Sequence, residues 1–183
     1  MGTILEAILK ATKYYYDTSL DEPKAKEIVE RINFTVRDRN EAAMLIAFLI
    51  VESDGFTWTE NDSAESFFSP YHGRGYIKLR CGSNYNDASR DLYEDDRLLK
   101  TPDFVATGAT FPAVTSCLDA SLWVWKKRVQ PLLARLPLVT FYMVMKALIG
   151  EGDKDSVSLK ERYDVYVIAA KHLGLTVGLT PMQ

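Results

Sequence analysis

The sequence predicts a mainly α fold of the α+β kind, in which one helical domain carries a small β-region near residues 71–80. Two observations lead to this prediction. Apolar residues recur at helical spacing along most of the chain, and strand-like alternation is confined to one short stretch. The 183 residues suffice for one domain with its own core and are too few to expect two. We therefore assign residues 1–183 to a single domain.

The first half of the chain predicts three helices. In residues 3–16 the apolar side chains recur at intervals of four, and residues 21–34 form a second, shorter helix. The third, EAAMLIAFLIVES, is apolar around its whole circumference, which indicates burial on nearly all sides. Asn40 is the expected N-cap of this helix, and Asp54-Gly55 is expected to end it.

The second half predicts one strand and four helices. YIKL, at residues 76–79, alternates as a short strand does, and TPDFVATGATFP is typical of a loop. At least one of Trp123 and Trp125 is expected in the core, because both lie on one apolar helix. The helices are expected at residues 84–93, 117–129, 138–149 and 159–173.

Composition narrows the class of protein. Hydrophobic residues make up 47% and charged residues 26%, which is ordinary for a globular protein. A net charge of −3 argues against a nucleic-acid partner, and no apolar run approaches the ~18 residues of a membrane span. The spacings of Cys81, Cys117, His72 and His172 fit no metal motif, so we expect no cofactor. A disulfide between the two cysteines is left open, and we expect a monomer.

Two glutamates stand out as candidate catalytic groups. Glu52 ends the most apolar helix, where poor solvation and the negative end of the helix dipole make a carboxyl group reluctant to ionise. Glu60 follows in a polar stretch. One carboxyl in an apolar setting and one in a wet loop suit an acid–base hydrolase. Glu65 is a second candidate for the base, and a Glu52 that points into water is the alternative.

Arg74 lies between two glycines in YHGRGYIKL. Because glycine lets the backbone approach closely and adopt unusual angles, an arginine held there is placed to hold something. An ordinary glycine-rich turn is the alternative.

Several segments, taken in order, resemble the motifs of glycoside hydrolase family 19, the chitinase family with a lysozyme-like fold, and its phage-endolysin relatives. The most distinctive is YHGRGYIKL, which is similar to Y-x-G-R-G-x-I-Q-L. The resemblance spans roughly residues 40–170 and implies a GRG turn at the start of a β-region that floors the substrate cleft. The other segments are VESDGF, TENDSAE, Asn84-Tyr85, TPDFVA, ASLWVWKK and GEGDKDSVSLKERYDVY.

The resemblance also implies roles for individual residues. Glu52 matches the general acid that protonates the glycosidic oxygen, and Glu60 matches the general base that activates water. Arg74, Glu151 and Arg162 match a supporting ion network, with the Arg162 guanidinium between two carboxylates. Asn84 is either a cleft amide or only a helix cap, and Tyr71 either stacks on sugar or is an ordinary half-buried tyrosine. The expected substrate-binding residues are Trp58, Tyr71, Lys78, Arg80 and Asn84.

Some positions depart from the family pattern. Val51 replaces the histidine before the acid, Lys78 replaces a glutamine, and Arg80 replaces a hydroxyl residue that helps to hold the attacking water. The late I-N-G-G motif is not recognisable in KALIGEG. Lys78 and Arg80 are expected on one side of the strand. There they lower the pKa of nearby carboxylates, bind an acidic glycan, or face solvent.

The sequence therefore predicts an inverting endo-hydrolase of β-1,4-linked N-acetylglucosamine polymers, most simply chitin. Two alternatives stay open: a glycan-binding protein that kept the fold but lost turnover, and a lysozyme-like enzyme that acts on peptidoglycan. The partner in each case is a polysaccharide. The resemblance implies secretion, but the N-terminus shows no signal-peptide pattern, so the compartment is left open.

Overall fold

The computed structural model describes residues 2–17, 20–57, 59–60, 69–107, 113–136, 139–149 and 156–177. These residues are largely helical, and their only β-pairing consists of two isolated bridges. The mainly α class predicted from the sequence is confirmed. The helices are α1 (Ile4–Tyr16), α2 (Glu22–Thr35), α3 (Arg39–Glu52), α4 (Gly82–Tyr93), α5 (Arg97–Lys100), α6 (Phe104–Thr107), α7 (Ala113–Arg128), α8 (Gln130–Arg135), α9 (Phe141–Ile149) and α10 (Ser156–His172).

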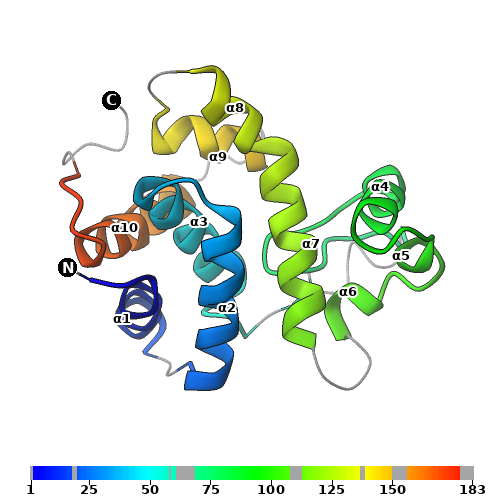
Figure 1. The fold of residues 1–183 in the computed structure, drawn as a ribbon, viewed down its shortest axis with the longest axis horizontal. Helices are drawn as coiled ribbons and strands as arrows, with labels where there is room; N and C mark the ends of the chain where they lie inside the picture. Colours follow the sequence, from blue (N-terminus) through cyan, green and yellow to red (C-terminus); the bar gives the residue numbers. More distant parts are fainter. Residues whose placement is uncertain are drawn as a thin grey trace.

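Helix α3 forms the centre of the core. Every residue from Glu41 to Ile50 is buried, as the continuous apolar sequence predicts. Helices α1 and α10 pack against α3 and against each other. Figure 1 shows these three helices on one side of the long helix α7, with α4, α5 and α6 grouped on its other side. Helix α7 therefore joins two helical groups.

The N-terminal cap of α3 is Asp38, so the expectation of Asn40 is wrong. The Asp38 carboxylate accepts the backbone N–H of Glu41 at 2.8 Å, so the cap lies two residues earlier than predicted. Asn40 lies inside the helix, where its side-chain oxygen accepts a hydrogen bond from the Tyr166 hydroxyl at 2.8 Å. The asparagine therefore ties α3 to α10 instead of capping α3.

The C-terminal end of α3 is a Schellman motif. The N–H of Gly55 donates to the carbonyl of Ile50 at 2.8 Å, and the N–H of Asp54 donates to that of Val51 at 3.5 Å. Asp54 adopts the left-handed conformation that this motif needs, with φ of 47°. The predicted end of the helix at Asp54-Gly55 is confirmed, and Glu52 occupies the last helical position.

Residues 75–78 form a turn, so the strand expected at YIKL, residues 76–79, is wrong. Arg74 and Leu79 pair as an isolated bridge, and the residues between them reverse the chain. Gly75 has φ of 88°, and its N–H donates to the Thr59 carbonyl at 2.7 Å. The Ile77 N–H donates to Ser121 Oγ at 2.9 Å. Because the N–H groups of Gly75 and Ile77 bond to other segments, the pairing does not extend into a longer β-ladder.

Other expectations were close. The segment expected as a loop, residues 101–112, contains the short helix α6. Trp123 and Trp125 are both buried, so both belong to the core. Cys81 is exposed and Cys117 is buried, and both are free thiols. Within the described ranges, no helix is long and apolar enough to cross a membrane.

Gly75→Ala is expected to lower the free energy of unfolding by about 2–3 kcal/mol. Alanine strains a positive φ, and its Cβ would lie 3.1 Å from both the Cys117 carbonyl oxygen and Ser121 Oγ. Gly174 also has a positive φ, 75°, but there the nearest atom is an Arg39 nitrogen at 4.0 Å. Gly174→Ala is the control, with an expected loss of about 1 kcal/mol in urea denaturation. Equal losses in the two variants would contradict the role of the close contact.

The two thiols are expected to react differently with a thiol reagent such as Ellman's reagent. Burial raises the pKa of Cys117 to about 12, with an opposing contribution from the Lys78 amine. Cys81 is exposed. At neutral pH the reagent should therefore modify one thiol of the folded protein and two thiols of the denatured protein. Two rapidly reacting thiols in the folded protein would rule out the buried position of Cys117.

Candidate active site

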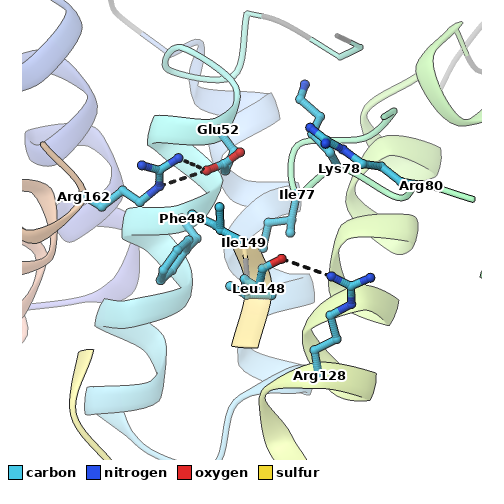
Figure 2. A pocket seen from close by; sticks show the side chains of 9 residues that line it. All are labelled: Phe48, Glu52, Ile77, Lys78, Arg80, Arg128, Leu148, Ile149 and Arg162. Carbon is cyan, nitrogen blue, oxygen red and sulfur yellow. Dashed lines mark hydrogen bonds and ion pairs between the residues drawn. The ribbon is translucent and has the colours of Figure 1, made fainter. Parts of the chain in front are cut away.

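A cavity of about 320 Å³ lies beside the C-terminal end of α3. Figure 2 shows that its walls come from α3, α7, α9, α10 and the turn after Arg74. Apolar and charged side chains share the lining. The apolar ones are Phe48, Ile77, Leu148 and Ile149, and the charged ones are Glu52, Lys78, Arg80, Arg128 and Arg162.

Glu52 and Arg162 form an ion pair in this cavity. Arg162 Nε donates to Glu52 Oε1 at 2.9 Å, and Arg162 Nη2 contacts the same oxygen. The arginine is buried, and the glutamate side chain is 19% exposed. The two residues are 110 positions apart in sequence and meet because α10 packs along α3. The pair holds the carboxylate in one orientation at the cavity wall.

Lys78 lies in the same cavity, across from Glu52 (Figure 2). Its ammonium nitrogen is buried and has no hydrogen-bond acceptor among the described residues. Burial lowers the pKa of Lys78, and the Arg80 guanidinium acts in the same direction, while the Glu52 carboxylate raises it. The predicted departure from the family pattern therefore places a buried, unbonded cation in the same cavity as the candidate acid.

Glu60 belongs to a second cluster, built around Arg74. Glu60 Oε2 lies 3.6 Å from Arg74 Nε and 3.5 Å from His72 Nε2, and its side chain is 49% exposed. Glu60 and Arg74 also form an isolated β-bridge through their backbones. Glu60 is not among the described residues that line the cavity. The two candidate carboxylates thus lie in different surroundings: the Glu52 side chain is mostly buried, and the Glu60 side chain is about half exposed.

Arg74 is buried and contacts three groups besides Glu60. Its Nη1 donates to the Pro70 carbonyl at 2.8 Å and to the Tyr85 hydroxyl at 3.2 Å, and its Nη2 pairs with Asp103. The Tyr85 hydroxyl in turn donates to the His72 carbonyl at 2.8 Å. The arginine of the GRG segment therefore links the turn to α4 and to the segment before α6, beside Glu60.

Tyr71 and Asn84 make contacts within the chain and do not line the cavity. The Tyr71 hydroxyl donates to the Leu99 carbonyl at 3.2 Å, and its ring centroid lies 5.4 Å from that of Tyr85. The Asn84 amide donates to the Arg80 carbonyl at 2.7 Å. Their participation in sugar binding stays a prediction. Trp58, Glu65 and Glu151 lie outside the described residues.

Sequence reasoning missed three residues of these clusters. His72 and Asp103 lie inside the motifs YHGRGYIKL and TPDFVA, so the motifs themselves were the available signal. Arg128 had no such signal, because it reaches the cavity only through the packing of α7 near α9. Its Nη1 donates to the Leu148 carbonyl at 3.1 Å. Among the described residues, no cluster of histidine, cysteine and acidic side chains could hold a metal ion.

Comparison with known proteins gives a consistent picture of the fold. No family model matches the chain. The chain is 26% identical over 162 residues to endochitinase EP3 of Arabidopsis thaliana; this match covers 81% of the chain and 56% of that protein. The chain therefore corresponds to little more than half the length of this curated relative.

Two solved structures are similar over almost the whole chain. Chitinase C from Streptomyces griseus HUT6037 has a TM-score of 0.64 at 20% identity, covering 98% of this chain and 80% of its own. A family GH19, class IV chitinase from Zea mays has a TM-score of 0.62 at 19% identity, covering 96% and 83%. The chain has the mainly α, lysozyme-like fold of the family 19 chitinases. The fold implied by the sequence motifs is confirmed.

Lys78→Met is expected to raise the free energy of unfolding at pH 7 by about 1 kcal/mol, because a buried ammonium without an acceptor is costly. The pKa of Lys78 is lowered in the folded protein, so the folded state binds fewer protons than the unfolded state above that lowered value. The contribution of Lys78 to the stability of the wild-type protein therefore rises with pH, up to the pKa of about 10.4 that lysine has in the unfolded chain. The stability advantage of Lys78→Met over the wild type shrinks accordingly.

Urea denaturation of both proteins at pH 7 and pH 10 measures this effect. Lys10→Met is the matched control, because Lys10 is exposed on α1 and its loss should change stability by less than about 0.5 kcal/mol. If Lys78→Met were less stable than wild type at pH 7, the Lys78 ammonium would have a hydrogen-bond partner in solution.

Proposed function

We propose that this chain is a glycoside hydrolase that cleaves within polymers of β-1,4-linked N-acetylglucosamine, most simply chitin. The single observation that carries the proposal is the position of Glu52: it lies in the wall of a cavity, at the end of a buried helix, oriented by Arg162. The fold shared with two chitinases and the sequence match to an endochitinase support it.

Glu52 is our candidate for the general acid. Both of its described bonds to Arg162 end on Oε1, and none of the described residues bonds to Oε2. We therefore assign Oε2 to proton delivery. In this mechanism the carboxyl group protonates the glycosidic oxygen as the bond to the sugar breaks. Phe48 and Ile77, which share the cavity wall, limit the access of water to that proton.

Glu60 is our candidate for the general base. A base must be ionised and must reach water, and Glu60 is half-exposed with the Arg74 guanidinium 3.6 Å away. In an inverting reaction this carboxylate takes a proton from the water that attacks the opposite face of the sugar. Arg74, bonded to Pro70, Tyr85 and Asp103, is a positioning residue for Glu60.

One observation favours a second candidate function, a glycan-binding protein without turnover. Lys78 and Arg80 share the cavity with Glu52. Cationic hydrogen-bond donors suit the binding of sugar oxygens and take no part in protonating a glycosidic bond. The same cavity could therefore bind sugar and fail to protonate the bond.

A chitin hexamer followed by NMR separates these functions. We expect wild-type protein to release products that are initially α-anomeric, since inversion changes the β-linkage to an α-product. Glu52→Gln and Glu60→Gln should each lower the rate by roughly 10²–10⁴-fold, because each removes a proton-transfer group. Glu30→Gln on the exposed side of α2 is the matched control and should keep the wild-type rate.

Three other outcomes would each contradict part of this proposal. Shifted protein resonances on adding the hexamer, with no products, would support the binding protein. Clearing of bacterial cell walls by protein that leaves the hexamer intact would point to a peptidoglycan hydrolase. Initial β-anomeric products would exclude the inverting mechanism while keeping the hydrolase.

A further inference from the structure

The described wall of the cavity beside Glu52 carries several cationic side chains. Among the described lining residues, four side chains are cationic and one is a carboxylate. Arg162 is the cation that pairs with Glu52. The remaining three, Lys78, Arg80 and Arg128, come from the turn and from the end of α7, and Figure 2 shows them away from the Glu52–Arg162 pair.

Of these three side chains, Lys78 gives the clearest indication of ligand binding. Its ammonium nitrogen is buried and bonds to no described residue, although buried charges in proteins are normally paired. The nearby Glu52 carboxylate is already bonded to Arg162. A ligand atom that accepts hydrogen bonds would satisfy the ammonium, and one with negative charge would also offset its neighbours.

Arg80 and Arg128 extend this cationic surface towards solvent. Both are exposed, and both line the cavity. Arg128 is held at the α9 end of the cavity by its bond to the Leu148 carbonyl. A guanidinium has several donors in one plane, which suits the two oxygens of a carboxylate or the oxygens of a sulfate.

The apolar part of the wall strengthens this attraction. Phe48, Ile77, Leu148 and Ile149 lie between the charged groups, and a charge interaction is stronger where water is displaced. A volume of about 320 Å³ falls in the range of small-ligand sites, so a sugar substituent can enter. A neutral sugar would leave the Lys78 ammonium without an anionic partner in this partly buried site.

We propose that this cavity binds an oxyanion carried by the glycan, so that the preferred ligand is an acidic amino-sugar polymer in which Lys78, Arg80 and Arg128 hold the charged substituent. The inference rests on the proposed function, because it places the acidic sugar beside the candidate acid Glu52. It deepens that function by naming the charge of the substrate.

Three tetrasaccharides with the same β-1,4 backbone test the proposal by calorimetry. One is neutral chitotetraose. The second alternates N-acetylglucosamine with N-acetylmuramic acid and carries carboxylates, and the third is chitotetraose bearing 6-O-sulfate. Binding is measured with Glu60→Gln, which is meant to stop turnover and leaves every described lining residue of the cavity unchanged.

We expect at least one charged tetrasaccharide to bind about 10-fold more tightly than the neutral one at low salt, and this preference to shrink in high salt. The charged ligand that shows the preference identifies the oxyanion. In Lys78→Met the preference should fall to about 2-fold or less, since the buried cation is gone. Lys10→Met, which removes an exposed cation of α1, should keep it.

Equal affinities for all three ligands would overturn the proposal, as would a preference that survives in Lys78→Met. Arg128→Gln, at an exposed position, provides a second variant if Lys78→Met does not fold. The two proposals fail separately. If wild-type protein cleaves neither the hexamer nor the acidic tetrasaccharide that it prefers to bind, only the hydrolase is removed. If it cleaves the hexamer without a charge preference in binding, only the oxyanion site is removed.

Discussion

The burial of α3 is the constraint on which the rest of the structure depends. A helix that is apolar on all sides must be covered by other elements, and here α1 and α10 provide much of that cover. The polar end of such a helix is then fixed in space by the packing of its apolar body. Glu52 ends α3, and α10 contributes Arg162 to hold it. The position of the candidate acid is therefore a consequence of core packing.

Two arginines and one lysine show how differently this fold treats buried cations. Arg74 and Arg162 are buried with carboxylate partners, Asp103 and Glu52 respectively, which offset the loss of solvation. The Lys78 ammonium is buried without an acceptor among the described residues. A group that costs stability and lies in a cavity beside a candidate catalytic carboxylate is a reasonable place to look for ligand binding. Stability and ligand binding are then in opposition at this position.

The two candidate carboxylates differ through their neighbours. Glu52 has an apolar wall and a paired guanidinium, and Glu60 has solvent, His72 and Arg74. Separate surroundings of this kind are how one protein assigns acid and base roles to chemically identical groups. Lys78 and Arg80 share the cavity with Glu52, so the candidate acid and the proposed oxyanion site occupy one cavity.

Local sequence determined the helices and the place of Glu52. The apolar run of α3, the Asp54-Gly55 stop and the order of the motifs were all readable, because helix periodicity and turn chemistry act over a few residues. Only the tertiary structure decided that Arg162 meets Glu52 across 110 residues and that Arg128 reaches the same cavity. It also turned YIKL into a bridge-closed turn, since Gly75 and Ile77 bond to distant segments. Such contacts depend on how helices pack, which no local pattern encodes.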